Sequence, residues 1–198
     1  ISPGIKAVRG RDQIRSLAPP MAGSASCEVD NQTKRYSPEY VAGALYGNLL
    51  PGRRVQIEAI YAAVTYYLWT GYLDDLPQYP DRSRLSVGLP AIGPLSKLAN
   101  QQISTALYSS IATGTAIGHV LDAVGWPAGD RVIDTGNTTL DWWWLNNTDA
   151  ISALRSLLAS EGPGAAIYED GLGRIVFEDR GYRRTTARSI TSQETFSD

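Results

Sequence analysis

Short segments of alternating apolar and polar residues, each bounded by turn-forming residues, dominate the first half of this chain. The clearest is Val55-Gln56-Ile57-Glu58-Ala59-Ile60, in which every second side chain is apolar, as in a strand with one buried face. Residues 24–29, 65–73 and 84–87 are further candidate strands. Several short strands at this spacing predict a barrel or a sandwich.

The middle of the chain changes to a helical period. Apolar residues recur at helical spacing between Ile103 and Val124, and Gly114 interrupts the series, so we expect two short helices there. Gly125-Trp126-Pro127 is a typical helix-ending sequence and closes the second one.

The last third predicts a strand, a helix and a hairpin. Residues 139–145 form the expected strand, and Thr148 is expected to cap the helix that follows it. Two short strands are expected at 165–168 and 174–177, joined by the turn Asp170-Gly171-Leu172-Gly173.

Composition limits the chemistry that the chain can carry. Of its 198 residues 43% are hydrophobic and 19% are charged, which is enough for a packed core, and the net charge of -2 indicates neither nucleic acid nor an anionic membrane as a partner. Cys27 is the only cysteine, which excludes an internal disulfide and a cysteine-based zinc site, and is expected to be a small core residue. His119 is the only histidine and is expected on a helix, as a packing or surface residue.

The charged residues do not form an evident active site. Adjacent carboxylates on a strand point to opposite faces, so such pairs are interpreted as turn and hairpin residues. The pairs are Asp74-Asp75, Glu169-Asp170 and Glu178-Asp179. Two arginine clusters are interpreted as solvated segments of mixed charge. They consist of Arg9, Arg11 and Arg15, and of Arg180, Arg183, Arg184 and Arg188.

Aromatic residues are the unusual feature, with 11 tyrosines and five tryptophans against two phenylalanines. On a strand, Trp142 and Trp144 share one face and Trp143 takes the other, so both faces need cover. Burial between layers or a subunit interface would supply this cover, and we predict that the interface residues include Trp142, Trp143, Trp144, Tyr66, Tyr67 and Trp69. The alternative is a platform on which sugars stack.

Several short motifs follow one another along the chain: Asp30-Asn31, Tyr36-Ser37-Pro38-Glu39, Pro51-Gly52-Arg53, Leu68-Trp69-Thr70-Gly71, Val124-Gly125-Trp126-Pro127 and Asp134-Thr135-Gly136. In this order they resemble a minor tail protein family of long-tailed actinobacterial phages. Trp69 stands where the family more commonly has phenylalanine. Residues 150–180, with Glu161-Gly162 and Asp170-Gly171, are also similar to the hub domains of contractile tails and of secretion-system spikes.

The resemblance implies a mainly β fold with α-helices (α+β), built from two small β-barrel-like hub subdomains with helices between them. The expected boundaries are 1–93 for the first subdomain, 94–130 for a helical connection, 131–182 for the second subdomain and 183–198 for the start of a linker or a further domain. The chain begins at Ile1, so it is expected to be part of a longer protein. No cofactor, metal or catalytic residue is implied.

The function implied by the resemblance is that of a structural part of the tail tip or baseplate hub of a siphovirus, at the distal end of the tail in the virion. The implied partners are further copies of the chain, as a trimer, and the tube, distal tail, tape measure and fibre or receptor-binding proteins. Phage DNA would pass transiently, and stable membrane insertion is not expected because no apolar run is long enough. The alternatives are a receptor- or carbohydrate-binding tail module and a peptidoglycan-degrading enzyme.

Overall fold

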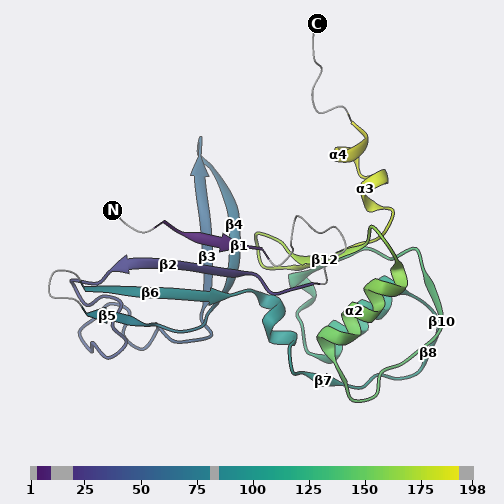
Figure 1. Cartoon of the computed structure of the whole chain (residues 1–198), viewed down its shortest axis with the longest axis horizontal. Coiled ribbons are helices and arrows are strands. Elements are labelled where there is room, and N and C mark those ends of the chain that lie inside the picture. Colours follow the sequence, from purple (N-terminus) through teal and green to yellow (C-terminus); the bar gives the residue numbers. More distant parts are fainter. Residues whose placement is uncertain (1–3, 10–19, 81–84, 192–198) are drawn as a thin grey trace, which may run out of the picture. The chain divides into compact units, whose positions relative to one another are not determined.

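The computed structural model describes residues 4–9, 20–80 and 85–191, which form two compact units (Figure 1). Unit 1 comprises Ile1–Arg11, Met21–Ser96 and Glu169–Arg174, and unit 2 comprises Asp12–Pro20, Lys97–Tyr168 and Ile175–Asp198. Strands outnumber helices in both units, so the fold class expected from the sequence, mainly β with α-helices, is confirmed. No helix among the described residues has both the length and the apolar character needed to cross a bilayer.

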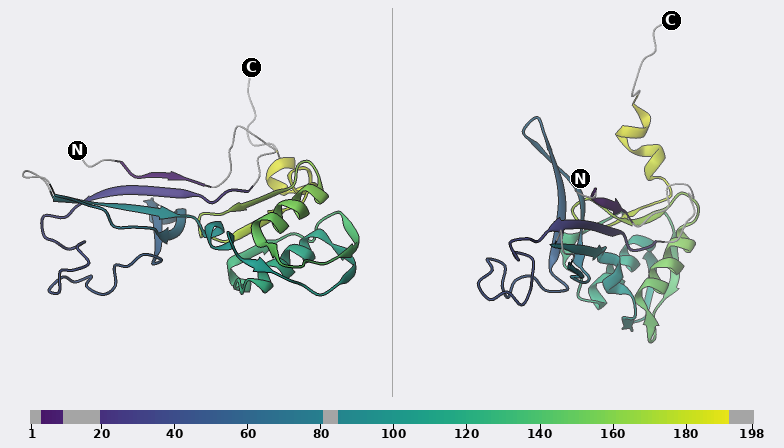
Figure 2. Two further views of the ribbon diagram at one scale, coloured as in Figure 1. Left: turned by 60° about the horizontal axis from the view of Figure 1, so that its bottom comes forward. Right: turned by 60° about the vertical axis from the view of Figure 1, so that its left-hand side comes forward.

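Unit 1 is built on one six-stranded antiparallel sheet with the order β1-β2-β6-β4-β3, in which β5 also pairs with β6. The strands are β1 (Lys6–Val8), β2 (Ser24–Asp30), β3 (Arg54–Tyr61), β4 (Val64–Leu73), β5 (Gln78–Pro80) and β6 (Leu85–Ile92). They confirm the strands expected from alternation, apart from Arg84, which lies outside the described residues. β4 pairs with β6 only at Tyr72 and Leu73, so the rest of the β3–β4 hairpin extends away from the sheet (Figures 1 and 2).

Trp69 lies at the centre of the unit 1 core. Its side chain is 1% exposed and packs with Ala25, Ala91 and Ile57. Gly71 follows two residues later, and a Cβ at that position would overlap the indole ring of Trp69. The sequence Trp-Thr-Gly is therefore a packing motif, in which the missing side chain makes room for the large one. Cys27 on β2 is half-buried, which raises the pKa of its thiol.

Unit 2 combines short strand pairs with two longer helices. One three-stranded sheet has the order β12-β13-β9, with β13 and β9 parallel, and two antiparallel pairs join β8 to β10 and β7 to β11. The strands are β7 (Gln102–Ile103), β8 (Tyr108–Ala112), β9 (Arg131–Ile133), β10 (Thr139–Trp143), β11 (Thr148–Asp149), β12 (Ala166–Glu169) and β13 (Ile175–Glu178). The helices are η1 (Pro94–Leu98), α1 (Thr113–Ala123), η2 (Ala128–Asp130), α2 (Ala150–Glu161), α3 (Tyr182–Thr185) and α4 (Ala187–Ile190).

Helices α1 and α2 lie side by side in unit 2 (Figures 1 and 2) and pack against each other. Residues three and four apart share one face of a helix, so each helix has an apolar stripe that faces the other helix. The side chains of these stripes are at most 2% exposed. They are Ile117, Val120 and Leu121 on α1 and Ala153, Leu154 and Leu157 on α2. Asp149 is the N-cap of α2, and its carboxylate accepts the Ser152 N–H at 3.0 Å.

Two sequence-based predictions for unit 2 are wrong. The expected first helix between Ile103 and Gly114 is instead β7, a loop and β8, because these residues pair with β11 and β10. The four-residue spacing of Ile103, Leu107 and Ile111 fits a helix, but Leu107 is 61% exposed in the loop between the two strands. Thr148 lies in β11, and its neighbour Asp149 caps α2.

Candidate interaction surfaces

The described residues bring together no group of three or more His, Cys, Asp or Glu side chains that could hold a metal ion. His119 lies on α1 and stacks on the Tyr108 ring, with ring centroids 4.3 Å apart and planes at 14°. Trp143 contacts the same tyrosine, at 5.9 Å between centroids. His119 is therefore a packing residue on its helix, as the sequence predicts.

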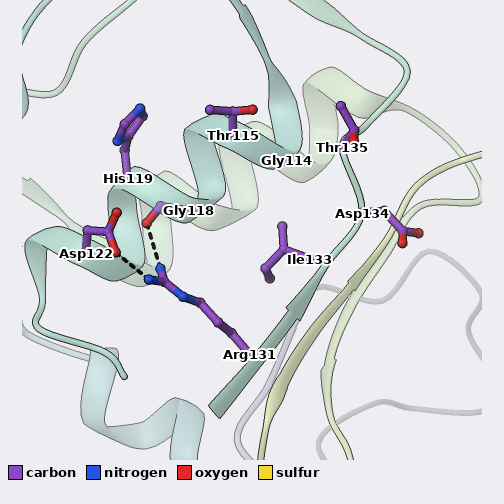
Figure 3. Close-up of a pocket in the computed structure, with 9 residues that line it drawn as sticks. All are labelled: Gly114, Thr115, Gly118, His119, Asp122, Arg131, Ile133, Asp134 and Thr135. Carbon is purple, nitrogen blue, oxygen red and sulfur yellow. Dashed lines mark hydrogen bonds and ion pairs between the residues drawn. The ribbon is translucent and has the colours of Figure 1, made fainter. Parts of the chain in front are cut away.

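A pocket of about 380 Å³ lies between α1 and the strand β9 (Figure 3). Its charged groups are tied to one another: the Arg131 guanidinium donates to the Asp122 carboxylate at 2.5 Å and to the Gly118 carbonyl at 3.1 Å. Asp134 at the same pocket accepts the Asp179 N–H at 3.1 Å. The contacts of Arg131 with Asp122 and Gly118 therefore join β9 to α1 along this pocket.

Glu161, the last residue of α2, is a buried carboxylate that joins separate parts of unit 2. It accepts the Thr113 hydroxyl at 2.5 Å, the N–H of Asn137 at 2.9 Å and the N–H of Thr138 at 3.1 Å, although its side chain has no exposure to solvent. Burial alone would raise the pKa of Glu161, but these hydrogen bonds outweigh it and hold the pKa below its ordinary value. The side chain therefore stays ionised and fixes the start of α1 to the loop before β10.

Glu169 is the corresponding buried carboxylate of unit 1. It is 2% exposed and accepts the N–H of Gly23 at 2.9 Å and of Leu95 at 2.6 Å. A Cβ at Gly93 would overlap this carboxylate, so the glycine makes room for it. Burial raises the pKa of Glu169, and the two backbone donors offset that effect only in part.

The opposite pKa shifts predict opposite pH dependences. Because the pKa of Glu169 is raised in the folded protein, its protonated side chain stabilises the fold below the ordinary glutamate pKa of about 4.3. This contribution is lost as pH rises through the pKa that Glu169 has in the folded protein. Compared with wild type, Glu169→Gln should therefore become relatively more stable as pH rises above about 4.3. Urea unfolding at a series of pH values measures the difference, and a difference that is flat or grows as pH falls would contradict the prediction.

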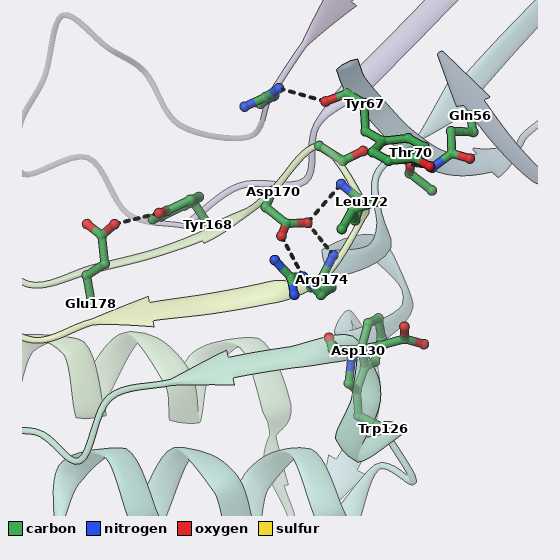
Figure 4. A network of polar contacts seen from close by, with 12 residues as sticks. Gln56, Tyr67, Thr70, Trp126, Asp130, Tyr168, Asp170, Leu172, Arg174 and Glu178 are labelled. Atoms are coloured by element: carbon green, nitrogen blue, oxygen red, sulfur yellow. Dashed lines mark hydrogen bonds and ion pairs between the residues drawn. The ribbon is translucent and has the colours of Figure 1, made fainter. Parts of the chain in front are cut away.

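The turn after β12 explains the Asp-Gly-Leu-Gly motif (Figure 4). The Asp170 carboxylate accepts the N–H of Leu172 at 2.9 Å and of Arg174 at 2.8 Å, and pairs with the Arg174 guanidinium at 2.7 Å. The Thr70 hydroxyl of β4 donates to the Gly171 carbonyl at 2.8 Å. A Cβ at Gly171 would overlap the Tyr67 carbonyl oxygen, so the motif serves close packing of the turn on β4.

The tryptophan run differs in exposure from one residue to the next. Trp142 on β10 is 66% exposed and Trp144 is 58% exposed, whereas Trp143 between them is half-buried against Tyr108. This alternation in exposure fits the pattern expected from the sequence, but the strand predicted over 139–145 ends at Trp143, so Trp144 lies just after β10. Trp143 packs within unit 2, which leaves Trp142 and Trp144 as the side chains that a partner can reach.

The free end of the β3–β4 hairpin is the second apolar surface. Here β4 does not pair with β6, and the large side chains of the ribbon stay exposed. Between 43% and 75% of each large side chain is exposed on Ile60, Tyr61, Val64, Tyr66, Tyr67 and Leu68. We call these six residues the hairpin surface.

Two of the three aromatic residues predicted on β4, Tyr66 and Tyr67, belong to the hairpin surface, whereas Trp69 is a core residue of unit 1. Ile60 and Tyr61 did not stand out in the sequence, because strand alternation does not show where a neighbouring strand stops. The sequence of the turn between β3 and β4 also gave little indication of a hairpin. Ala62 and Ala63 both take positive φ values, 48° and 62°, which hairpin turns normally reserve for glycine and asparagine.

No protein-family model matches the chain. Over 81 residues it is 36% identical to a fibrillarin-like rRNA/tRNA 2'-O-methyltransferase of Thermococcus gammatolerans, a match that covers 40% of this chain and 31% of that protein. The chain is similar in structure to the 43 kDa tail protein of prophage MuSo2 from Shewanella oneidensis, with a TM-score of 0.55 and 14% identity over 87% of this chain. It is also similar to the c3393 protein of E. coli, a component of the type VI secretion system, with a TM-score of 0.49 and 10% identity over 80% of this chain and 42% of that one.

The chain spans 49% of the length of the prophage tail protein and less than a third of the methyltransferase. At 14% identity the similarity to the tail protein concerns the fold, and it extends over both units because it covers 87% of the chain. This chain therefore has the fold of a phage tail protein.

Proposed function

We propose that the chain is a structural component of a bacteriophage tail tip or baseplate hub, which joins the tail tube to the adsorption apparatus at the distal end of the tail. The observation that carries the proposal is the fold shared with a prophage tail protein over 87% of the chain. The ordered sequence motifs, which resemble minor tail proteins of siphoviruses, support it. In this role residues 1–93 and 131–182 act as the two hub subdomains, and the assembled ring leaves a channel for DNA.

The exposed aromatic surfaces support an assembled state. Monomeric proteins seldom expose large contiguous apolar patches, and a two-stranded ribbon is marginally stable alone. The hairpin surface has this character, and Trp142 and Trp144 add the residue type most enriched at interface centres. We propose that both surfaces contact further copies of the chain, in a trimer, or adjoining tail proteins.

The Trp142→Ser/Trp144→Ser double variant should weaken self-association by at least about tenfold, because each exposed indole removes a large apolar contact area from the interface. Its monomer stability should stay within about 0.5 kcal/mol of wild type, as for other surface substitutions. Size-exclusion chromatography with light scattering measures the association. Tyr46→Ser is the control, since Tyr46 is 50% exposed on a loop outside both surfaces.

Immunogold electron microscopy of intact virions tests the location. An antibody against this chain should label only the distal end of the tail. Label along the tube, label on the capsid, or no label would contradict the hub proposal.

A second candidate function is a receptor- or carbohydrate-binding tail module, and the exposed indoles of Trp142 and Trp144 favour it, because aromatic faces are platforms for stacking. Virions that carry the double variant separate the two functions. Complete virions that no longer adsorb to the host would favour the binding module, whereas a failure of tail assembly would favour the hub.

We propose no enzymatic activity for the chain. The partial match to a methyltransferase is not accompanied by the parallel sheet on which doubly wound enzymes bind nucleotides. Among the described strands, only β9 and β13 pair in parallel. Zymography on peptidoglycan tests the remaining enzymatic alternative, and a cleared band would contradict the proposal.

A further inference from the structure

A hollow of about 410 Å³ lies in unit 2 where the chain leaves β13 and enters α3. Two arginines and an asparagine dominate its lining, which makes it different from the pocket beside α1, where the only arginine is already paired with a carboxylate. The lining residues are Asn137, Asp179, Arg180, Gly181, Arg184 and Thr185.

Several donors in this hollow are available to a ligand. Within the part of the chain that the structure describes, neither the Arg184 guanidinium nor the Asn137 side-chain amide has a hydrogen-bond partner. The Arg180 guanidinium makes one long contact, to the Asn137 carbonyl at 3.4 Å, and is exposed. The guanidinium groups and the amide therefore offer N–H groups from both sides of the hollow.

The backbone around these donors is held in place by buried and half-buried carboxylates. Glu161 accepts the N–H of Asn137 at 2.9 Å and the N–H of Arg180 at 3.5 Å, so it ties the two sides of the hollow to one anchor. The Asp179 carboxylate accepts the Gly181 N–H at 2.7 Å and fixes the turn between the strand and α3. The backbone that carries these donors is therefore fixed before a ligand binds.

The charges select the class of ligand. Arg180 and Arg184 carry two positive charges and Asp179 one negative charge, so the lining has an excess of one positive charge. A guanidinium offers a planar pair of N–H donors that matches the two oxygens of a carboxylate. We propose that this hollow is a recognition pocket for a carboxylate, which an acidic side chain of a neighbouring protein supplies.

The test is an NMR titration of the complete 198-residue chain with the peptide acetyl-Gly-Glu-Gly-amide. The side-chain signals of Arg184 and Asn137 should shift and saturate, whereas the same peptide with glutamine in place of glutamate should leave them unchanged. Arg184→Gln should weaken binding by at least about tenfold, because a charge-assisted contact is lost. Arg183→Gln is the matched control: it removes the same charge from an exposed position of α3 that does not line the hollow.

The Arg183→Gln variant should bind within about twofold of wild type, well inside one tenfold step of affinity. Equal weakening by the two variants would show general charge attraction and overturn the proposal. A response to the glutamine peptide, no saturation, or tighter binding of inorganic phosphate would also overturn it. Circular dichroism establishes that both variants are folded. The titration uses the isolated chain, so its outcome is independent of where the protein lies in a virion.

Discussion

Gly114→Ala is expected to lower the free energy of unfolding by at least about 3 kcal/mol, because the added methyl group has no space. Gly114 lies in the first turn of α1 and is buried, and its N–H donates to the Thr135 carbonyl at 2.9 Å. A Cβ there would overlap the carbonyl oxygens of Asp134 and Thr135. These are backbone atoms, so the clash can be relieved only if the helix and the loop after β9 move apart.

Gly118→Ala is the matched control on the same helix. A Cβ at Gly118 meets no atom within 4 Å, so the substitution adds helix propensity without a clash. It should stabilise the chain by about 0.5–1 kcal/mol. Urea unfolding followed by circular dichroism measures both variants. If Gly114→Ala did not have a lower free energy of unfolding than Gly118→Ala, the close approach of α1 to residues 134 and 135 would be contradicted.

Glu161→Ala is expected to lower the free energy of unfolding by about 3–5 kcal/mol at neutral pH, because three donors lose their acceptor and each buried donor left unsatisfied costs about 1–3 kcal/mol. The substitution leaves the hydroxyl of Thr113 and the N–H groups of Asn137 and Thr138 without their acceptor. The loss should become smaller on acidification. Glu161 has a lowered pKa, so the stability that it contributes is present above about pH 4.3 and is lost as pH falls through the folded-state pKa.

Glu39→Ala removes a carboxylate from an exposed loop position and should change the free energy of unfolding by less than about 0.5 kcal/mol at neutral pH. Urea unfolding at neutral pH and at pH values below 4 measures both variants. The anchoring role of Glu161 would be refuted by a loss as small as that of Glu39→Ala, or by a loss that increased as the solution became acidic.

Local pattern was sufficient to predict much of the secondary structure. The alternation in β3 and the apolar stripe of α2 depend on neighbours two to four residues apart, so the sequence alone predicts them. The turn of the β12–β13 hairpin was predictable for the same reason, because the Asp170 carboxylate contacts groups only two and four residues away. Local pattern failed between Ile103 and Ile111, where a four-residue spacing suited a helix but pairing with distant strands decided for β-structure.

What the sequence by itself determined is therefore the class of elements and the turns. Only the tertiary structure decided which polar residues are buried and which aromatic residues are free. Glu161 meets the hydroxyl of Thr113 across 48 residues, and Glu169 meets the N–H of Gly23 across 146. Trp69 is buried because it packs on Ala25 and Ala91, whereas Tyr66 and Tyr67, on the same strand, stay exposed. The physical reason is that burial depends on which distant segment covers a side chain, and no local spacing carries that information.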